Sequence, residues 1–519
     1  MIFARFKELL GKLPFLGLVV ATAGVVSLAI ASLGWRIEHD LAYMAYVTSA
    51  IDHWHLVPYR DLFEINMPGC FVLYMLLGHW GGYSDLGFRI ADLIYLALIC
   101  AATIALLRPF GAQAAWGGAV MFALAYLLLG PFSSLQREYL LILPITLTLL
   151  LLLRGQRLPL WATAGGIGLL FGCCLLVKPH AIIALPVAFV VLLLRWRREA
   201  RPRAQRITAV LVMAGAFAAP ILVAIGWLVH VNAWTPLVRV TTQYVPLYAV
   251  LGDRHQMIEG SRLAYAVQGY FASIQQFGLW IPPALLAAAL LLVGKGVEPV
   301  RRWEARVLAA YAVCYLIYPA LAAKYWTYHW FIALYFLTLF AGLCLADWFQ
   351  TREHLLRLAP MVVLTVVALC IALPLIDEVP VEIDPGAQGA RLSGMEKIIA
   401  RLQPTLRPGD RIQPIEWNGG IAQAMLRMNV PPATPYLVDF IFHHHLSNPF
   451  VQGMKADFIA KLEHARPRYV VMKTRNPFYP SGRDTSRDFP ELRHLLATEY
   501  KMTWAEHGYR IYERKLSEP

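Results

Sequence analysis

The sequence has few charged residues and no cysteine pairs of the kind that bind structural metals. Of its 519 residues, 58% are hydrophobic and only 15% are charged, which excludes an ordinary soluble protein of two or three domains. The 7 cysteines are scattered through mostly apolar runs without a CxxC pair, so a zinc ribbon is excluded. No glycine-rich phosphate-binding loop stands between a strand and a helix, which leaves nucleotide binding unsupported.

The net charge of +13 could indicate nucleic-acid binding, but the basic residues occur mainly in short loops between apolar runs. That distribution sets the orientation of membrane proteins. We therefore expect the lipid bilayer as a partner and no nucleic acid.

Apolar runs long enough to cross the hydrocarbon core recur along the chain. They predict a polytopic α-helical membrane protein with about eleven transmembrane helices. The predicted spans are 14–34, 85–107, 111–130, 139–153, 158–177, 181–194, 207–230, 277–293, 306–321, 330–346 and 359–376. No small-residue cleavage site follows the first run, so we expect it to remain as a helix rather than be removed as a signal peptide.

Basic residues fall on one side of these spans, and the densest cluster is RWRREARPRAQR at 195–206. This side is predicted to be cytoplasmic and to include the N-terminus. The opposite face then receives the loops 35–84, 133–139, 177–180, 231–276 and 323–330, and everything after 377. These loops mix carboxylates, histidines and aromatic residues, which is typical of a site at the membrane surface.

Three regions are predicted from the change of composition: a membrane domain at 1–376, a linker at 377–390 and an extracytoplasmic α/β domain at 391–519. Within the last, Ile412 and the run 469–472 are expected to form buried strands. Within the first loop, helical spacing of apolar residues predicts interfacial helices near 43–54 and 68–80.

Several motifs follow one another in a fixed order on the predicted outer face. They are PYRD at 58–61, NMPG at 66–69, FRIADL at 88–93, QREYLLILP at 136–144, KPH at 178–180 and KYWTYHW at 324–330. Together they resemble the C-type (GT-C) membrane glycosyltransferases that use polyprenyl-phosphate sugars, in particular the bacterial protein-O-mannosyltransferase-like and aminoarabinose-transferase-like branches. The resemblance covers roughly 1–376 and implies a multi-pass protein of the bacterial inner membrane.

The resemblance implies inverting transfer of a sugar from a polyprenyl-phosphate donor to an acceptor hydroxyl, with a glycolipid or cell-surface polysaccharide as the preferred acceptor. Asp40 matches the acidic residue of the family's first loop and would be the general base that accepts the hydroxyl proton. The family often has Asp-Glu here, whereas this chain has Glu38, His39, Asp40 and Leu41. We favour Asp40, and Glu38 remains the alternative.

A departing donor phosphate needs cationic partners. The candidates are Arg60, Arg137, Lys178, His180, Lys324 and His329. Lys178 and Lys324 stand beside span ends, where lysines also occur for structural reasons. Glu64 either positions the acceptor or pairs with Arg60. Glu138 either belongs to the site or pairs with its neighbour Arg137.

No cofactor is predicted, and a divalent metal is left open, because distant members carry a paired acidic motif where this chain has SSLQREY at 133–139. Two other functions compete with this one. A lipid or polysaccharide transporter or flippase would place charges in the middle of several spans. A polysaccharide polymerase or ligase would act on the same face, with arginines in a large exported loop.

Overall fold

The computed structural model describes residues 2–294, 296–346, 362, 365–369, 385–417, 420–474 and 481–515. The chain divides into two compact units. The first, here called the helical unit, comprises Met1–Trp35, Arg89–Val223 and Val267–Val381. The second, the mixed unit, comprises Arg36–Phe88, Ala224–Ala266 and Glu382–Pro519.

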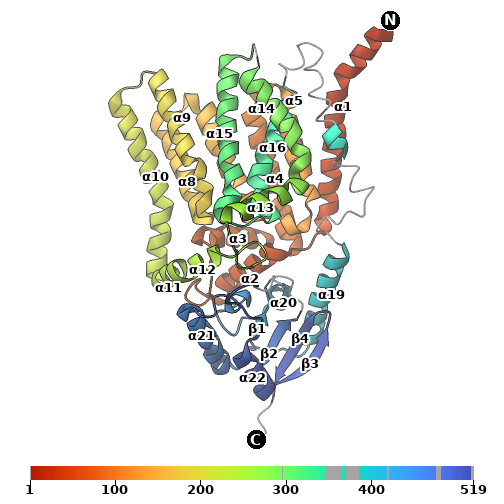
Figure 1. Ribbon diagram of the computed structural model, residues 1–519, viewed down its shortest axis with the longest axis vertical. Helices are drawn as coiled ribbons and strands as arrows, with labels where there is room; N and C mark the ends of the chain where they lie inside the picture. Colours follow the sequence, from red (N-terminus) through yellow and green to blue (C-terminus); the bar gives the residue numbers. More distant parts are fainter. Residues whose placement is uncertain are drawn as a thin grey trace. The chain divides into compact units, whose positions relative to one another are not determined.

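Long apolar helices form the helical unit, and α4, α10 and α13 begin or end in the other unit. Their bounds are α1 (Ile2–Ala31), α4 (Asp85–Leu107), α5 (Ala112–Leu128), α6 (Arg137–Leu140), α7 (Ile142–Arg154), α8 (Leu160–Val177), α9 (Leu185–Arg198), α10 (Arg203–His230), α13 (Arg262–Phe277), α14 (Ile281–Val293), α15 (Pro299–Ala322) and α16 (Phe331–Leu343). Figure 1 shows α8, α9, α14, α15 and α16 as roughly parallel rods. The helical fold predicted from the apolar runs is thus confirmed.

Seven helical segments among the described residues are long and apolar enough to cross a membrane, or eight if the bent pair Arg262–Ile274 and Gly278–Val293 counts as one span. The predicted spans at 111–130 and 330–346 coincide with the shorter apolar helices Ala112–Leu128 and Thr327–Leu343. The predicted span at 359–376 lies largely outside the described residues. The total of about eleven spans therefore stays a prediction.

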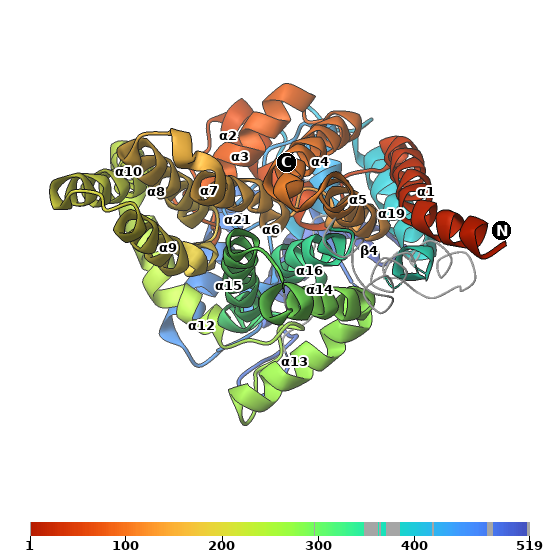
Figure 2. The same cartoon turned by 90° about the horizontal axis from the view of Figure 1, so that it is seen from above.

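Small residues allow the central helices of this unit to approach closely. Helix α5 packs against both α1 and α16, and α14 packs against α16, as the view from above shows (Figure 2). A Cβ atom added to Gly342 would lie 2.4 Å from the backbone nitrogen of Gly118. Gly342 therefore has no room for a larger side chain, and such close contacts at small residues are common between membrane helices.

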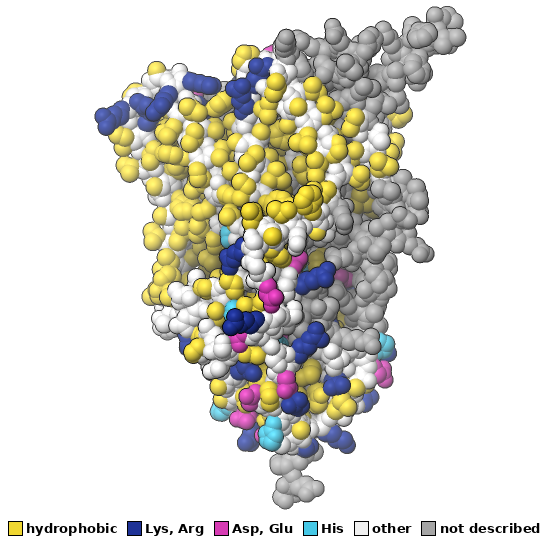
Figure 3. Space-filling view, in the orientation of Figure 1, with side chains coloured by type: hydrophobic (Ala, Val, Ile, Leu, Met, Phe, Trp, Pro, Cys, Tyr) yellow, Lys and Arg dark blue, Asp and Glu magenta, His cyan; other side chains and the backbone are white. Residues whose placement is uncertain are grey.

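The basic loops predicted to be cytoplasmic meet at one end of the helices. Arg154 pairs with Glu304, Arg301 lies 3.4 Å from the same carboxylate, and the Arg198 guanidinium lies 4.5 Å from the centre of the Trp303 ring. Figure 3 shows hydrophobic side chains over the visible face of the helices, with Lys and Arg gathered where α9 and α10 meet. This arrangement agrees with the predicted sidedness of these loops, while the orientation itself stays a prediction.

A four-stranded sheet of order β1-β2-β4-β3 organises the mixed unit. Strand β1 (Ile412–Ile415) runs parallel to β2 (Tyr469–Lys473), and β4 (Tyr509–Arg514) is antiparallel to both β2 and β3 (Tyr500–Glu506). The predicted strands at Ile412 and 469–472 are thus confirmed. The helices of this unit are α2 (His39–Trp54), α3 (Pro68–Gly81), α11 (Trp234–Arg239), α12 (Val245–Ala249), α19 (Pro385–Leu402), α20 (Gly420–Met428), α21 (Pro449–Ala465) and α22 (Pro490–Glu499).

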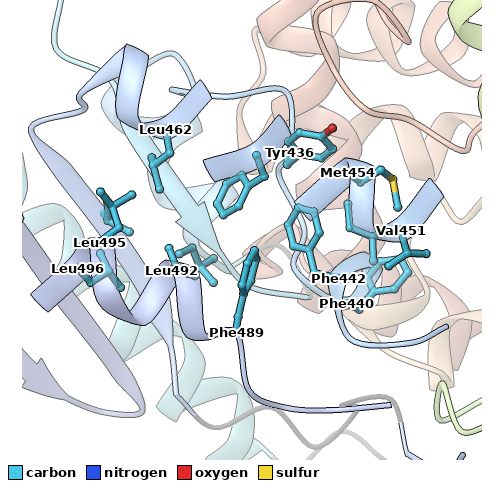
Figure 4. Packing of buried hydrophobic residues seen from close by; sticks show 14 of the residues in the cluster. Tyr436, Phe440, Phe442, Val451, Met454, Leu462, Phe489, Leu492, Leu495 and Leu496 are labelled. Atoms are coloured by element: carbon cyan, nitrogen blue, oxygen red, sulfur yellow. The ribbon is translucent and has the colours of Figure 1, made fainter. Parts of the chain in front are cut away.

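The first loop segment, 36–88, packs with the C-terminal residues in the mixed unit. Helix α2 lies against α20, the Tyr46 hydroxyl donates to the Val430 carbonyl at 3.0 Å, and the Gln423 side chain donates to the Ile37 carbonyl at 2.7 Å. The predicted domain bounds, with 35–84 in the membrane domain, stay a prediction. Beneath the sheet, aromatic and leucine side chains of α21, α22 and the preceding loops form the core (Figure 4).

Candidate functional site

Glu138 is the centre of a buried polar cluster in the helical unit. Its side chain is fully buried, forms an ion pair with the Lys178 ammonium, and accepts a hydrogen bond of 3.3 Å from the Tyr318 hydroxyl. Glu138 is the second residue of α6, whereas Lys178 follows the last residue of α8. Glu138 thus pairs with a residue forty positions away in the sequence, and Arg137 adds a further positive charge near its carboxylate.

His329 contributes an imidazole ring to this cluster. Its Nδ1 lies 2.8 Å from the Lys324 carbonyl, and a carbonyl can only accept, so Nδ1 carries the proton. Nε2 lies 3.2 Å from Lys178 Nζ and 3.3 Å from Glu138 Oε1. In the neutral ring Nε2 carries no proton and accepts from the Lys178 ammonium. His329 and Glu138 thus both fix the position of this ammonium.

Aromatic rings enclose the Lys178 ammonium. It lies 5.9 Å from the centre of the Tyr318 ring and 6.0 Å from that of Tyr328, and the His180 ring meets Tyr318 edge-on. Cations are stabilised over such rings. The loops at 133–139, 177–180 and 323–330, which the sequence placed on one face, therefore converge here, and they bring Arg137, Glu138, Lys178, His180, Lys324 and His329 together.

A second buried network of hydrogen bonds holds the loop that carries Glu138. The sequence analysis did not predict this network. Asp92 pairs with Arg89, and its carboxylate accepts hydrogen bonds from the Tyr126 hydroxyl at 2.7 Å and from the Ser134 hydroxyl at 2.5 Å. The Tyr139 hydroxyl donates to the Asp92 carbonyl at 3.3 Å. The FRIADL motif at 88–93 thus holds both ends of the 133–139 loop. In the sequence, the only indication of this role is the presence of two charged residues inside an apolar run.

Asp40 lies in the mixed unit, in the first turn of α2. Its side chain is 25% exposed and lies 3.1 Å from Nδ1 of His39. The positive end of the helix dipole favours a carboxylate at this position. His39 has a φ of 51° and lies against the Trp417 ring, which in turn contacts His255. The long loop at 231–276 and the C-terminal residues thus supply aromatic side chains next to the Asp40 turn.

Glu64 accepts hydrogen bonds from two neighbouring side chains. It is 1% exposed and accepts from the Tyr43 hydroxyl at 2.6 Å and from the Asn66 amide at 2.9 Å. Arg60 instead pairs with Asp61 at 2.8 Å and donates to the Val231 carbonyl at 3.0 Å. The predicted alternative of a Glu64–Arg60 pair is therefore wrong, because the adjacent Asp61 provides the nearer carboxylate. Tyr43 follows Asp40 by one helical turn, so Glu64 is fixed on the same side of α2.

Each of the three consecutive histidines at 443–445 lies within hydrogen-bond distance of another residue of the mixed unit. Nδ1 of His443 lies 2.9 Å from the Ser486 carbonyl, Nε2 of His444 lies 3.0 Å from the Tyr244 hydroxyl, and Nε2 of His445 lies 3.1 Å from the Leu247 carbonyl. They tie α12 and the loop before α22 to the core. Among the described residues, no three His, Cys, Asp or Glu side chains lie together as a metal ion would require.

Glu416 and Asp439 form a buried acidic pair beside the sheet. Glu416 accepts hydrogen bonds from the backbone nitrogens of Ile421 and Ala422 at 2.9 and 2.8 Å. Burial raises the pKa of both carboxyls, and the Glu416 charge raises the pKa of Asp439 further, to about 7. The folded protein thus binds a proton at Asp439 more tightly than the unfolded chain, whose ordinary value is 3.8.

This shift gives the stability a pH dependence. The contribution of Asp439 to the free energy of unfolding is fully present below the pKa of this residue in the unfolded chain. It is lost as the pH rises from about 4 through about 7. We expect Asp439→Asn to change stability little at pH 4 and to stabilise the protein at pH 8, by a few kcal/mol. Thermal unfolding of the purified protein at both pH values measures this. The exposed control Glu463→Gln should show no such trend, and a destabilised Asp439→Asn at pH 8 would contradict the assignment.

Comparisons with known proteins identify the fold. No protein-family model matches the sequence, and no curated protein matches it. The chain is similar to the crystal structure of ArnT from Cupriavidus metallidurans bound to undecaprenyl phosphate, with a TM-score of 0.50 and 15% sequence identity, over 96% of this chain and 98% of that one. The apo structure of the same protein gives a TM-score of 0.45 at 15% identity, over 95% and 97% of the two chains. The chain therefore has the fold of ArnT, which agrees with the resemblance predicted from the motifs.

Proposed function

We propose that this protein is an inverting glycosyltransferase of the bacterial inner membrane. It would move a sugar from a polyprenyl-phosphate donor to a hydroxyl of a glycolipid or cell-surface polysaccharide, at the extracytoplasmic face. The observation that carries the proposal is the convergence of Lys178, His329 and Arg137 around a single buried carboxylate, Glu138. Three loops far apart in the sequence supply these groups, and together they carry more positive than negative charge, as an anionic ligand requires.

The chemistry divides between a base and an anion-binding group. The Asp40 carboxylate accepts the acceptor's hydroxyl proton while that oxygen attacks the anomeric carbon. The bond between the anomeric carbon and the phosphate oxygen then breaks, and polyprenyl phosphate leaves with the electron pair. Lys178 and Arg137 stabilise the charge that develops on the phosphate. Glu138 holds Lys178 in place, and Nε2 of His329 accepts a hydrogen bond from the Lys178 ammonium.

The remaining candidates take supporting roles in this proposal. Lys324 orients His329 through its carbonyl, and His180 lines the aromatic enclosure of Lys178. Glu64, held rigidly by Tyr43 and Asn66, positions the acceptor on the Asp40 side of α2. Arg60 is exposed and already paired with Asp61, so it contacts the donor phosphate only at the surface. The similar crystal structure of ArnT contains bound undecaprenyl phosphate, which supports a lipid of this kind as the donor carrier.

An assay in proteoliposomes distinguishes a transferase from a transporter. The proteoliposomes would contain the purified protein, a radiolabelled polyprenyl-phosphate sugar and extracted bacterial envelope glycolipids. We expect the label to move to the glycolipid or polysaccharide fraction as free polyprenyl phosphate appears in equal amount. Movement of intact donor between leaflets without free polyprenyl phosphate would contradict the proposal and identify a flippase. A panel of donors with different sugars identifies the one that is transferred.

A further inference from the structure

The mixed unit contains a cavity that has no part in the proposed transfer. It has a volume of about 470 Å³ and lies between one face of the sheet and helices α21 and α22. Ile415, Met472 and Tyr512 line it from the sheet, while Leu492 and Leu496 line it from α22. The register pairs Ile415 with Met472 and Val470 with Tyr512, so these strands present one continuous face to the cavity. A space of this size is typical of small-molecule sites.

A buried carboxyl group lies in the wall of this cavity. Asp439 is 4% exposed, and its Oδ1 has no hydrogen-bond partner among the residues that the structure describes. Buried polar atoms are nearly always satisfied in native proteins. An atom of this kind beside a cavity therefore indicates a ligand that donates a hydrogen bond.

Arginines add positive charge to the same lining. Arg487, Arg493 and Arg510 all line the cavity, and one acidic residue there, Asp488, pairs with Arg493 at 3.1 Å. Arg510 lies opposite Met472 in the register and is exposed. The lining thus combines an apolar wall, a buried hydrogen-bond acceptor and guanidinium groups, which bind carboxylate or phosphate groups well.

We propose that this cavity binds one or two sugar units that carry an anionic group, with a sugar hydroxyl donating to Asp439 and the anion contacting Arg510. The C–H faces of a sugar ring suit the apolar wall. An acyl chain would fill the same wall but would leave Oδ1 of Asp439 without a donor, which is costly in a buried position. The inference rests on the proposed function only in one respect, namely that such a ligand would be part of the acceptor glycan. The site would then hold the acceptor away from the reacting bond.

Binding to the purified full-length protein tests this without any turnover. Calorimetry would be carried out in a detergent that has no sugar head group, with digalacturonate as the probe. The neutral disaccharide lactose and n-dodecyl phosphate are the comparison ligands. We expect digalacturonate to bind at millimolar concentration or below, and Arg510→Gln and Asp439→Asn each to weaken it about tenfold. Arg411→Gln, which changes an exposed arginine outside the lining, should change binding less than about twofold.

Each of the other results would overturn the inference. These are no binding of digalacturonate by the wild type, unchanged binding by Arg510→Gln, and tighter binding of dodecyl phosphate than of digalacturonate. Equal binding of lactose would remove the anionic group from the proposal. Because Arg510 is exposed, its substitution should leave the fold intact even if Asp439→Asn alters it. Binding without sugar transfer would leave this inference standing while the proposed function fails, and transfer without binding would do the reverse.

Discussion

Asp40→Asn is expected to slow sugar transfer by about 10²- to 10⁴-fold, because asparagine cannot accept the proton of the attacking hydroxyl. The amide has nearly the same shape as the carboxylate, so donor binding and stability should change little. The loss should therefore appear in kcat rather than in KM for the donor. Initial rates in membranes with matched protein amounts measure this effect.

The same helix provides a matched control. Asp52 is another aspartate of α2, and it lies 2.9 Å from His79, away from the first turn. Asp52→Asn should keep most of the transfer rate. Wild-type rates for Asp40→Asn would remove this residue from the mechanism and direct attention to Glu38 or Glu64.

Lys178→Met is expected to impair the protein in two separable ways. It leaves the Glu138 carboxylate, which is fully buried, without its ion-pair partner. Breaking a buried pair from one side typically costs about 3–5 kcal/mol. It also removes the cation proposed to stabilise the departing phosphate, so transfer should fall by about 10²-fold or more. Thermal unfolding and transfer rate are measured on the same preparation.

The double variant Lys178→Met/Glu138→Gln distinguishes structure from chemistry. Without the carboxylate, no uncompensated charge is buried, and stability should largely recover. Transfer should remain low, because the leaving phosphate still lacks its cation. Recovery of both stability and transfer would show that the pair only supports the fold and would contradict the proposed role of Lys178.

Much of the fold was predictable because the signals for helices and strands come from residues that are close together in the sequence. Apolar runs of sufficient length predict helices, and ten of the predicted spans coincide with helices or helical segments of the structure. The placement of Lys and Arg predicted which loops share a side, and three of the loops predicted to share the outer side do converge at Glu138. Strand periodicity likewise located β1 and β2. These signals are local, so a single sequence carries them.

Partner choice within the site was harder to predict. Glu138 pairs with Lys178, forty positions away in the sequence. Glu64 accepts hydrogen bonds from Tyr43 and Asn66, although Arg60 is the nearest arginine in the sequence. Such pairings depend on how helices pack, which a local pattern does not determine. The Asp92 network shows the same limit, because its partners Tyr126 and Ser134 have no spacing relation to Asp92.

The grouping of 36–88 with the C-terminal residues was also not predictable. Composition separates apolar spans from polar segments, but it does not show which polar segments pack together. Here Tyr46 and Gln423 make hydrogen bonds between regions nearly four hundred residues apart in sequence. The C-terminal residues are thus part of the surroundings of Asp40 rather than a separate appendage, through the contact of Trp417 with His39.

The central claim is that Asp40 prepares an acceptor hydroxyl for a single displacement at the anomeric carbon. The most direct measurement is the anomeric configuration of the product, determined by nuclear magnetic resonance after transfer from a polyprenyl-phosphate sugar of known configuration. A single displacement predicts that the configuration is inverted in the wild-type product. A retained configuration would require a covalent intermediate or attack from the leaving-group side, and would contradict the role assigned to Asp40.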